Sequence, residues 1–114
     1  SVFSNTFTTE NVGSKWIKIA TLPAATSSTK DITKVVLTGG DWGIAPMIIT
    51  AWFRNRLGFK YQYKKEGNNN FISLFALSVS GGAVDIWIFL EGTNAYSVAN
   101  WSIDAIETEV YKII

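Results

Sequence analysis

Few side chains in this sequence could carry out catalytic or metal chemistry. Its 114 residues include no histidine and no cysteine. A Ser-His-Asp triad, a Cys-His dyad, a zinc site built on histidine or cysteine, and a disulfide bridge are therefore excluded. Carboxylates, lysines and tyrosines are the groups that remain for acid–base chemistry.

The carboxylates do not form a catalytic or metal-binding pattern. Asp85 and Glu91 fall on one face of an expected strand, but they lie about 20 Å apart along an extended chain. That separation exceeds the spacing of a glycosidase carboxylate pair. Asp104, Glu107 and Glu109 cluster near the end of the chain without the pattern of a calcium loop. We therefore expect no enzymatic activity, no metal and no other cofactor.

Polar and aromatic residues at expected loops could instead bind a ligand. Asp41 and Trp42 lie among glycines, where the indole could stack on a sugar and the carboxylate accept its hydroxyls. Alternatively, Trp42 folds back and closes the end of the domain. Asn69, Asn94 and Tyr96 offer amides and a phenol that suit a polyhydroxylated ligand, or they are solvated loop tips.

Two arginines form a further candidate site. Arg54 and Arg56 flank one asparagine and could bind a carboxylate or phosphate of an acidic glycan. A salt bridge with Glu91 or Glu107 would explain them equally well. The net charge of +1 gives no attraction toward nucleic acid, and no apolar run is long enough to cross a membrane.

The elements that position these residues are expected to be strands. No stretch keeps a helical period for three turns, and glycine, asparagine and proline punctuate short apolar runs. About eight strands are predicted, which favours an all-β fold, an antiparallel β-sandwich or jelly roll. The expected strands are residues 15–22, 32–38, 47–54, 59–64, 71–80, 83–91, 96–103 and 108–114.

Three of these predictions are specific. Residues 83–91 have one fully apolar face and one half-apolar face, which predicts a strand in the middle of a sheet. Residues 39–43 contain three glycines and are expected to break the chain before Pro46. In residues 59–64 aromatic side chains alternate with Lys and Gln, which predicts a strand with one wet face, at the edge of a sheet.

The domain organisation is expected to be simple. Residues 1–14 are polar and begin without Met, so we expect a lead-in from an upstream part of the chain, with room for a short edge strand. Residues 15–114 are expected to form a single domain. Several strands are apolar on both faces, so the chain has more apolar surface than one core can bury. Either a homo-oligomer or the upstream part of the chain would cover the remaining apolar surface.

Several short motifs follow one another in a specific order. KWIKIATL at Lys15–Leu22 is followed by Ile32–Leu37 leading into two glycines, the arginine-bearing Ile48–Arg56, VDIWI at Val84–Ile88 and YSV at Tyr96–Val98. This order resembles the carboxy-terminal head domains of tailed-bacteriophage tail fibres and tailspikes, and KWIKIATL is the most specific match.

This resemblance implies a non-enzymatic, homotrimeric head with a knob or TNF-like jelly roll at the tip of the virion tail. It would act outside the cell and bind a surface polysaccharide, a lipopolysaccharide or an outer-membrane protein. One alternative is a structural domain that trimerises and caps the fibre without binding a ligand. The other is a monomeric carbohydrate-binding module of a hydrolase.

Overall fold

The computed structural model of the chain describes residues 2–8, 14–24, 32–41, 44–67, 72–90, 98–105 and 112–113. Within these residues the chain forms nine strands and one short 3-10 turn, Ser80–Gly82. The strands are β1 (Val2–Thr8), β2 (Lys15–Leu22), β3 (Thr33–Asp41), β4 (Ile44–Asn55), β5 (Phe59–Glu66), β6 (Ile72–Ser78), β7 (Val84–Leu90), β8 (Val98–Ala105) and β9 (Lys112–Ile113).

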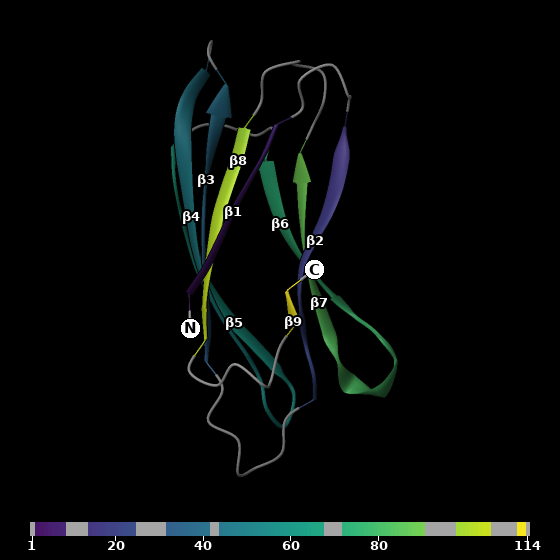
Figure 1. Cartoon of the computed structure of the whole chain (residues 1–114). Coiled ribbons are helices and arrows are strands. Elements are labelled where there is room, and N and C mark those ends of the chain that lie inside the picture. Colours follow the sequence, from purple (N-terminus) through teal and green to yellow (C-terminus); the bar gives the residue numbers. More distant parts are fainter. Residues whose placement is uncertain are drawn as a thin grey trace.

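The strands form two antiparallel sheets that face one another (Figure 1). Sheet A has the order β1-β8-β3-β4-β5, and sheet B has the order β6-β7-β2-β9. The predicted all-β sandwich is therefore confirmed. The segment before residue 15 contains an edge strand, because β1 pairs with β8 from Val2 opposite Asp104 to Thr8 opposite Val98.

Strand β7 is central in sheet B, as its one fully apolar and one half-apolar face predict. It pairs with β6 on one side and with β2 on the other. β2 contains a bulge, because Lys18 lies opposite Trp87 whereas Ala20 lies opposite Ile86. Ile19 is the additional residue, and both Ile19 and Ala20 are fully buried. The bulge therefore lets β2 present two consecutive side chains to the core.

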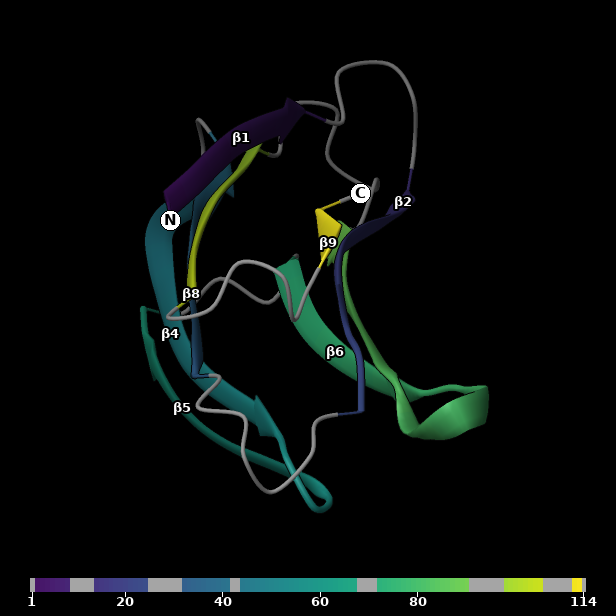
Figure 2. The same ribbon diagram turned by 60° about the horizontal axis from the view of Figure 1, so that its bottom comes forward.

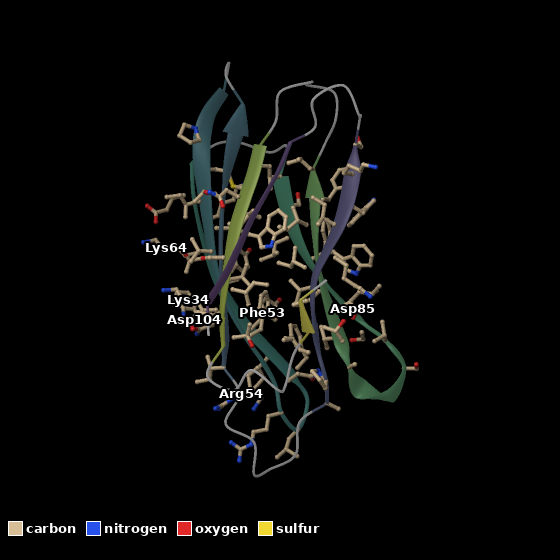
Figure 3. The ribbon with its side chains drawn as sticks, in the orientation of Figure 1. Lys34, Phe53, Arg54, Lys64, Asp85 and Asp104 are labelled. Carbon is tan, nitrogen blue, oxygen red and sulfur yellow. The ribbon has the colours of Figure 1, made fainter. Side chains whose placement is uncertain are left out.

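The core lies between the sheets and follows the period-2 alternation of the strands. Ile86, Ile88 and Leu90 of β7 are fully buried, and they face the inner side chains of β3, β4 and β8. Figure 3 shows Phe53 between the two sheets, while Lys34 lies on the outer side of sheet A. Among the described residues, no helix is long and apolar enough to cross a membrane.

The sequence predicts that the chain leaves its strand at residues 39–43, and this prediction is wrong for the first residues of that range. β3 continues to Asp41, because Gly39 pairs with both neighbouring strands and Gly40 pairs with β8. β4 likewise begins before Pro46, at Ile44. Between the Gly39–Met47 and Asp41–Ile44 pairs the register shifts, with one additional residue on β4. The proline thus lies in an irregularity, where a missing backbone donor is tolerated.

The prediction that residues 59–64 form an edge strand is confirmed, but the prediction that only one of its faces is wet is wrong. Both faces of β5 are open to solvent from Lys60 onward, including Tyr61 and Tyr63. The reason is topological, since β5 is the edge strand of sheet A, paired with β4 alone. Its ring-bearing face continues the inner face of sheet A, because Tyr61 lies opposite Phe53 and Tyr63 opposite Ala51, but both tyrosines remain exposed.

Candidate functional site

The structure places few of the sequence-predicted binding residues. Asp41 ends β3, but its side chain is not among those described. Arg54 and Arg56 are half-buried at the end of β4. The remaining predictions lie outside the described residues: Trp42, Asn69, Asn94 and Tyr96.

Arg54 belongs to the outer surface of sheet A. Together with Trp52, Lys60 and Gln62 it borders a shallow depression of about 380 Å³. Both Arg54 and Lys60 are cationic, and Lys34 lies 5.9 Å from the centre of the Trp52 ring, so this surface is basic and partly aromatic. Figure 3 shows Arg54 near the lower end of β4, well below Lys64 in the view.

A larger groove runs between the edge strands of the two sheets. β5 of sheet A and β6 of sheet B border it, and its volume is about 570 Å³. Figure 2 shows these two strands at the same side of the sandwich. Its floor includes core residues of β4 and β6, among them Ala51, Phe53 and Ile72. We call this feature the aromatic groove.

One wall of the aromatic groove is a row of three rings, Phe59, Tyr61 and Tyr63, which we call the ring ladder. Residues two apart in a strand share a face, which places the three rings in line. The ring centroids of Phe59 and Tyr61 are 5.9 Å apart, and those of Tyr61 and Tyr63 are 6.5 Å apart. The ring planes differ by 22° and 17°. Phe53 continues the row at 5.8 Å from Phe59.

The ring ladder is open to solvent. Tyr61 is 62% exposed and Tyr63 67% exposed, whereas Phe59 is half-buried against the core. Lys65 and Ser73 add a cation and a hydroxyl to the lining, and no carboxylate is among the described residues that border the groove. Such a surface can stack on apolar ring faces and form hydrogen bonds through its phenols.

A second exposed apolar surface lies on the outer side of sheet B. We define the outer apolar face as Trp16, Phe75, Leu77, Trp87 and Phe89. Adjacent strands bring these side chains together, because Trp16 lies opposite Phe89 and Phe75 opposite Trp87. The Trp16 ring centroid is 4.6 Å from that of Phe89 and 5.1 Å from that of Phe75.

A polar group borders the outer apolar face. Asp85 accepts a 2.8 Å hydrogen bond from the Thr21 hydroxyl and lies 3.8 Å from the Lys18 ammonium. The same ammonium is 5.8 Å from the Trp87 ring centre. Trp87 Nε1 is buried and has no hydrogen-bond partner among the described residues. Asp85 is thus held in place by a hydrogen bond and an ion pair within the chain.

Sequence reasoning missed the aromatic groove as a site. The alternation of rings with Lys and Gln in β5 was visible, and it was interpreted as a solvated edge strand. The signal that could have identified the site is that every second residue of this strand is aromatic. A solvated edge strand does not require three aromatic side chains on one face. Among the described residues, no group of three acidic side chains is placed to hold a metal ion.

Comparison with known proteins adds one informative likeness. No protein-family model matches the sequence, and no curated protein is significantly similar to it. Among solved structures, tailspike protein gp49 of Acinetobacter baumannii bacteriophage Fri1, a capsular polysaccharide depolymerase, matches with a TM-score of 0.64 and 10% sequence identity. The match covers 99% of this chain and 19% of the tailspike. At this identity the likeness shows a shared fold, and the chain spans about one fifth of that tailspike's length.

Proposed function

We propose that this domain belongs to a phage tail fibre or tailspike and binds a bacterial surface polysaccharide in the aromatic groove without cleaving it. The observation that carries the proposal is the exposed ring ladder of β5, with Tyr61 and Tyr63 each more than 60% exposed. A large apolar surface left open on a folded domain commonly marks a binding site. The shared fold with part of a phage tailspike supports the viral setting.

The ligand class follows from the shape and chemistry of the groove. From Phe59 to Tyr63 the ladder extends for roughly 13 Å, so successive rings can meet successive units of an extended chain. Pyranose rings have apolar faces that pack on aromatic rings, and their hydroxyls can bond to the tyrosine phenols and to Ser73. Lys65 would favour a polymer that carries carboxylates.

The loop residues predicted from sequence extend this proposal. Asp41, Trp42, Asn69, Asn94 and Tyr96 remain predicted contacts for the glycan. The two arginines at the end of β4 are predicted to contribute if the glycan is acidic. Location at the tip of the virion tail, action outside the cell and assembly as a homotrimer are parts of the same proposal.

The test is a binding measurement with a panel of purified capsular polysaccharides, including that of Acinetobacter baumannii. Calorimetric titration of the wild-type domain should identify at least one polymer that binds. Tyr61→Ala and Tyr63→Ala should each weaken that binding about tenfold, which corresponds to about 1.4 kcal/mol. Lys64 lies on the opposite face of the same strand and borders neither the groove nor the depression beside Arg54, so Lys64→Ala should leave the affinity within about twofold.

Two results would overturn the proposal. The first is a wild-type domain that binds no polymer of the panel. The second is equal affinity of the wild type and both tyrosine variants, which would move the site away from the groove. Incubation with the bound polymer should release no shorter fragments, because the described lining of the groove holds no carboxylate.

A structural role in assembly is the second candidate function. The outer apolar face favours it, because Trp16, Phe75 and Leu77 are all exposed on one side of sheet B. A domain of this kind would form a stable oligomer and bind none of the polysaccharides. The titration above and the mass measurement below separate the two functions.

A further inference from the structure

We infer that the outer apolar face of sheet B is covered by a second copy of this chain. This inference deepens the assembly part of the proposed function by naming the surface that joins the copies. It is carried by three observations: the unprotected edge of β6, the area of the face, and its charge.

The edge strand β6 lacks the features that normally prevent strand pairing between molecules. It pairs with β7 on one side, and its other edge is unpaired within the described part of the chain. Its sequence, ISLFALS, contains no charge and no proline. β5, the neighbouring edge of sheet A, carries Lys60, Lys64, Lys65 and Glu66. Charged residues protect an edge from further pairing, so β6 is the edge left open to a partner.

The exposed apolar area of the face is large enough for a small specific interface between two copies. Trp16 is 55% exposed, Phe75 44% and Leu77 55%, and both Trp87 and Phe89 are half-buried. With roughly 150–250 Å² for each large side chain, the face exposes roughly 400 Å² of apolar surface. Two such faces, with the usual polar share of an interface, would bury roughly 1,200–1,400 Å² in total. This is the lower end of the range for specific interfaces.

The charges on the face favour a copy of the same chain over other partners. Lys18 and Asp85 contribute one charge of each sign, they lie 3.8 Å apart, and Asp85 is buried. Their charges therefore compensate each other within one chain. The remaining surface is neutral and apolar, and the same surface of a second copy matches it. A nucleic acid or an anionic membrane would require an excess of positive charge, which this face does not have.

The face and the ring ladder belong to different sheets. The ladder lies on β5 of sheet A, whereas the outer apolar face lies on β2, β6 and β7 of sheet B. Phe75 borders both features, so it is not a suitable residue for a selective test. Leu77 and Trp16 do not border the groove and can be changed without altering its lining.

The test is the solution mass of the wild type and three variants, measured by light scattering behind a sizing column. We expect the wild type to have the mass of two or more chains. Leu77→Lys and Trp16→Glu should lower it to that of one chain, 12.6 kDa. Leu57→Lys is the matched control, because Leu57 is 75% exposed in a turn outside the outer apolar face and should leave the mass unchanged.

A second measurement keeps the inference testable if a variant fails to fold. Amide hydrogen exchange of the wild type should show β6 protected at high protein concentration and less protected after dilution. A wild type that is monomeric at every concentration would overturn the inference, as would variants of unchanged mass. An oligomer that depends on Leu77 but binds no polysaccharide would uphold this inference and defeat the glycan proposal.

Discussion

The side-chain amide of Asn55 in β4 donates a 2.9 Å hydrogen bond to the backbone carbonyl of Leu22 in β2. The same nitrogen donates a second bond, also of 2.9 Å, to the carbonyl of Gly82, just before β7. β4 belongs to sheet A, whereas β2 and β7 belong to sheet B. One buried amide group thus joins the two sheets at the end of the sandwich.

Removing this amide should lower the stability of the fold. Asn55→Ala leaves the buried Leu22 carbonyl and the part-buried Gly82 carbonyl without their donor, and we expect the free energy of unfolding to fall by about 2–4 kcal/mol. Asn55→Asp should be worse, because its carboxylate would face the same two carbonyls with no hydrogen to donate. Urea unfolding measures both. Asn100→Ala is the control, since Asn100 is exposed on β8 and should change stability by less than about 0.5 kcal/mol. Equal losses at the two positions would contradict the assignment.

The Asp85 carboxylate should matter mainly as a hydrogen-bond acceptor. Asp85→Asn keeps an oxygen for the Thr21 hydroxyl and loses the contact with Lys18, so the cost should stay below about 1 kcal/mol. Asp85→Ala removes both interactions, and about 1–2 kcal/mol is expected. Thermal unfolding of the two variants compares them directly. If both lose the same stability, the charge rather than the hydrogen bond is the important part of the site.

Two glycines with similar backbone angles should respond differently to a methyl group. Gly67 has φ +97°, and a Cβ there would lie 2.5 Å from the Pro46 carbonyl oxygen. Gly58 has φ +111°, and a Cβ there would meet nothing within 4 Å. Both alanine variants pay backbone strain of about 1–2 kcal/mol. Gly67→Ala must also displace β4, so its midpoint of urea unfolding should be clearly lower than that of Gly58→Ala. Matching midpoints would show that β4 moves away at little cost.

The rings of the aromatic groove should contribute little to folding. Tyr61 and Tyr63 are mostly exposed, so replacing either by alanine should lower the unfolding free energy by less than about 1 kcal/mol. Ile86 is fully buried in β7, and Ile86→Ala should cost about 2–5 kcal/mol. Calorimetry of the three variants provides the comparison. Large losses of unfolding free energy in both tyrosine variants would mean that the rings stabilise the fold rather than serve as a binding surface.

Local patterns were sufficient to predict most of the strands. β2 begins and ends where the alternation and Pro23 place it, and β7 has the central position that its one fully apolar and one half-apolar face indicate. The end of β3 was mispredicted because glycine signals a turn when read alone. In the folded chain Gly39 is held on both sides, by Met47 of β4 and Ala99 of β8. Pairing between distant segments overrides the local signal there.

The aromatic groove could be predicted only in part. The alternating rings of β5 can be read from the sequence, but their exposure depends on β5 being an edge strand opposite β6. No local pattern encodes which strand ends a sheet or what lies across from it. The outer apolar face has the same origin, since Trp16 meets Phe89 through a pairing between segments far apart in the chain.

The place of β8 in sheet A has a consequence for the synthesis of the chain. β8 lies between β1 and β3, and Val2 at one end of the sequence pairs with Asp104 near the other. On a ribosome, β3, β4 and β5 can pair as neighbours while the chain grows, but β1 has no partner until β8 has emerged. Sheet A can therefore be completed only once almost the whole domain has been translated. Folding that depends on such distant pairings is slow, so the nascent chain passes through a stage in which the edges of β1 and β3 are both open.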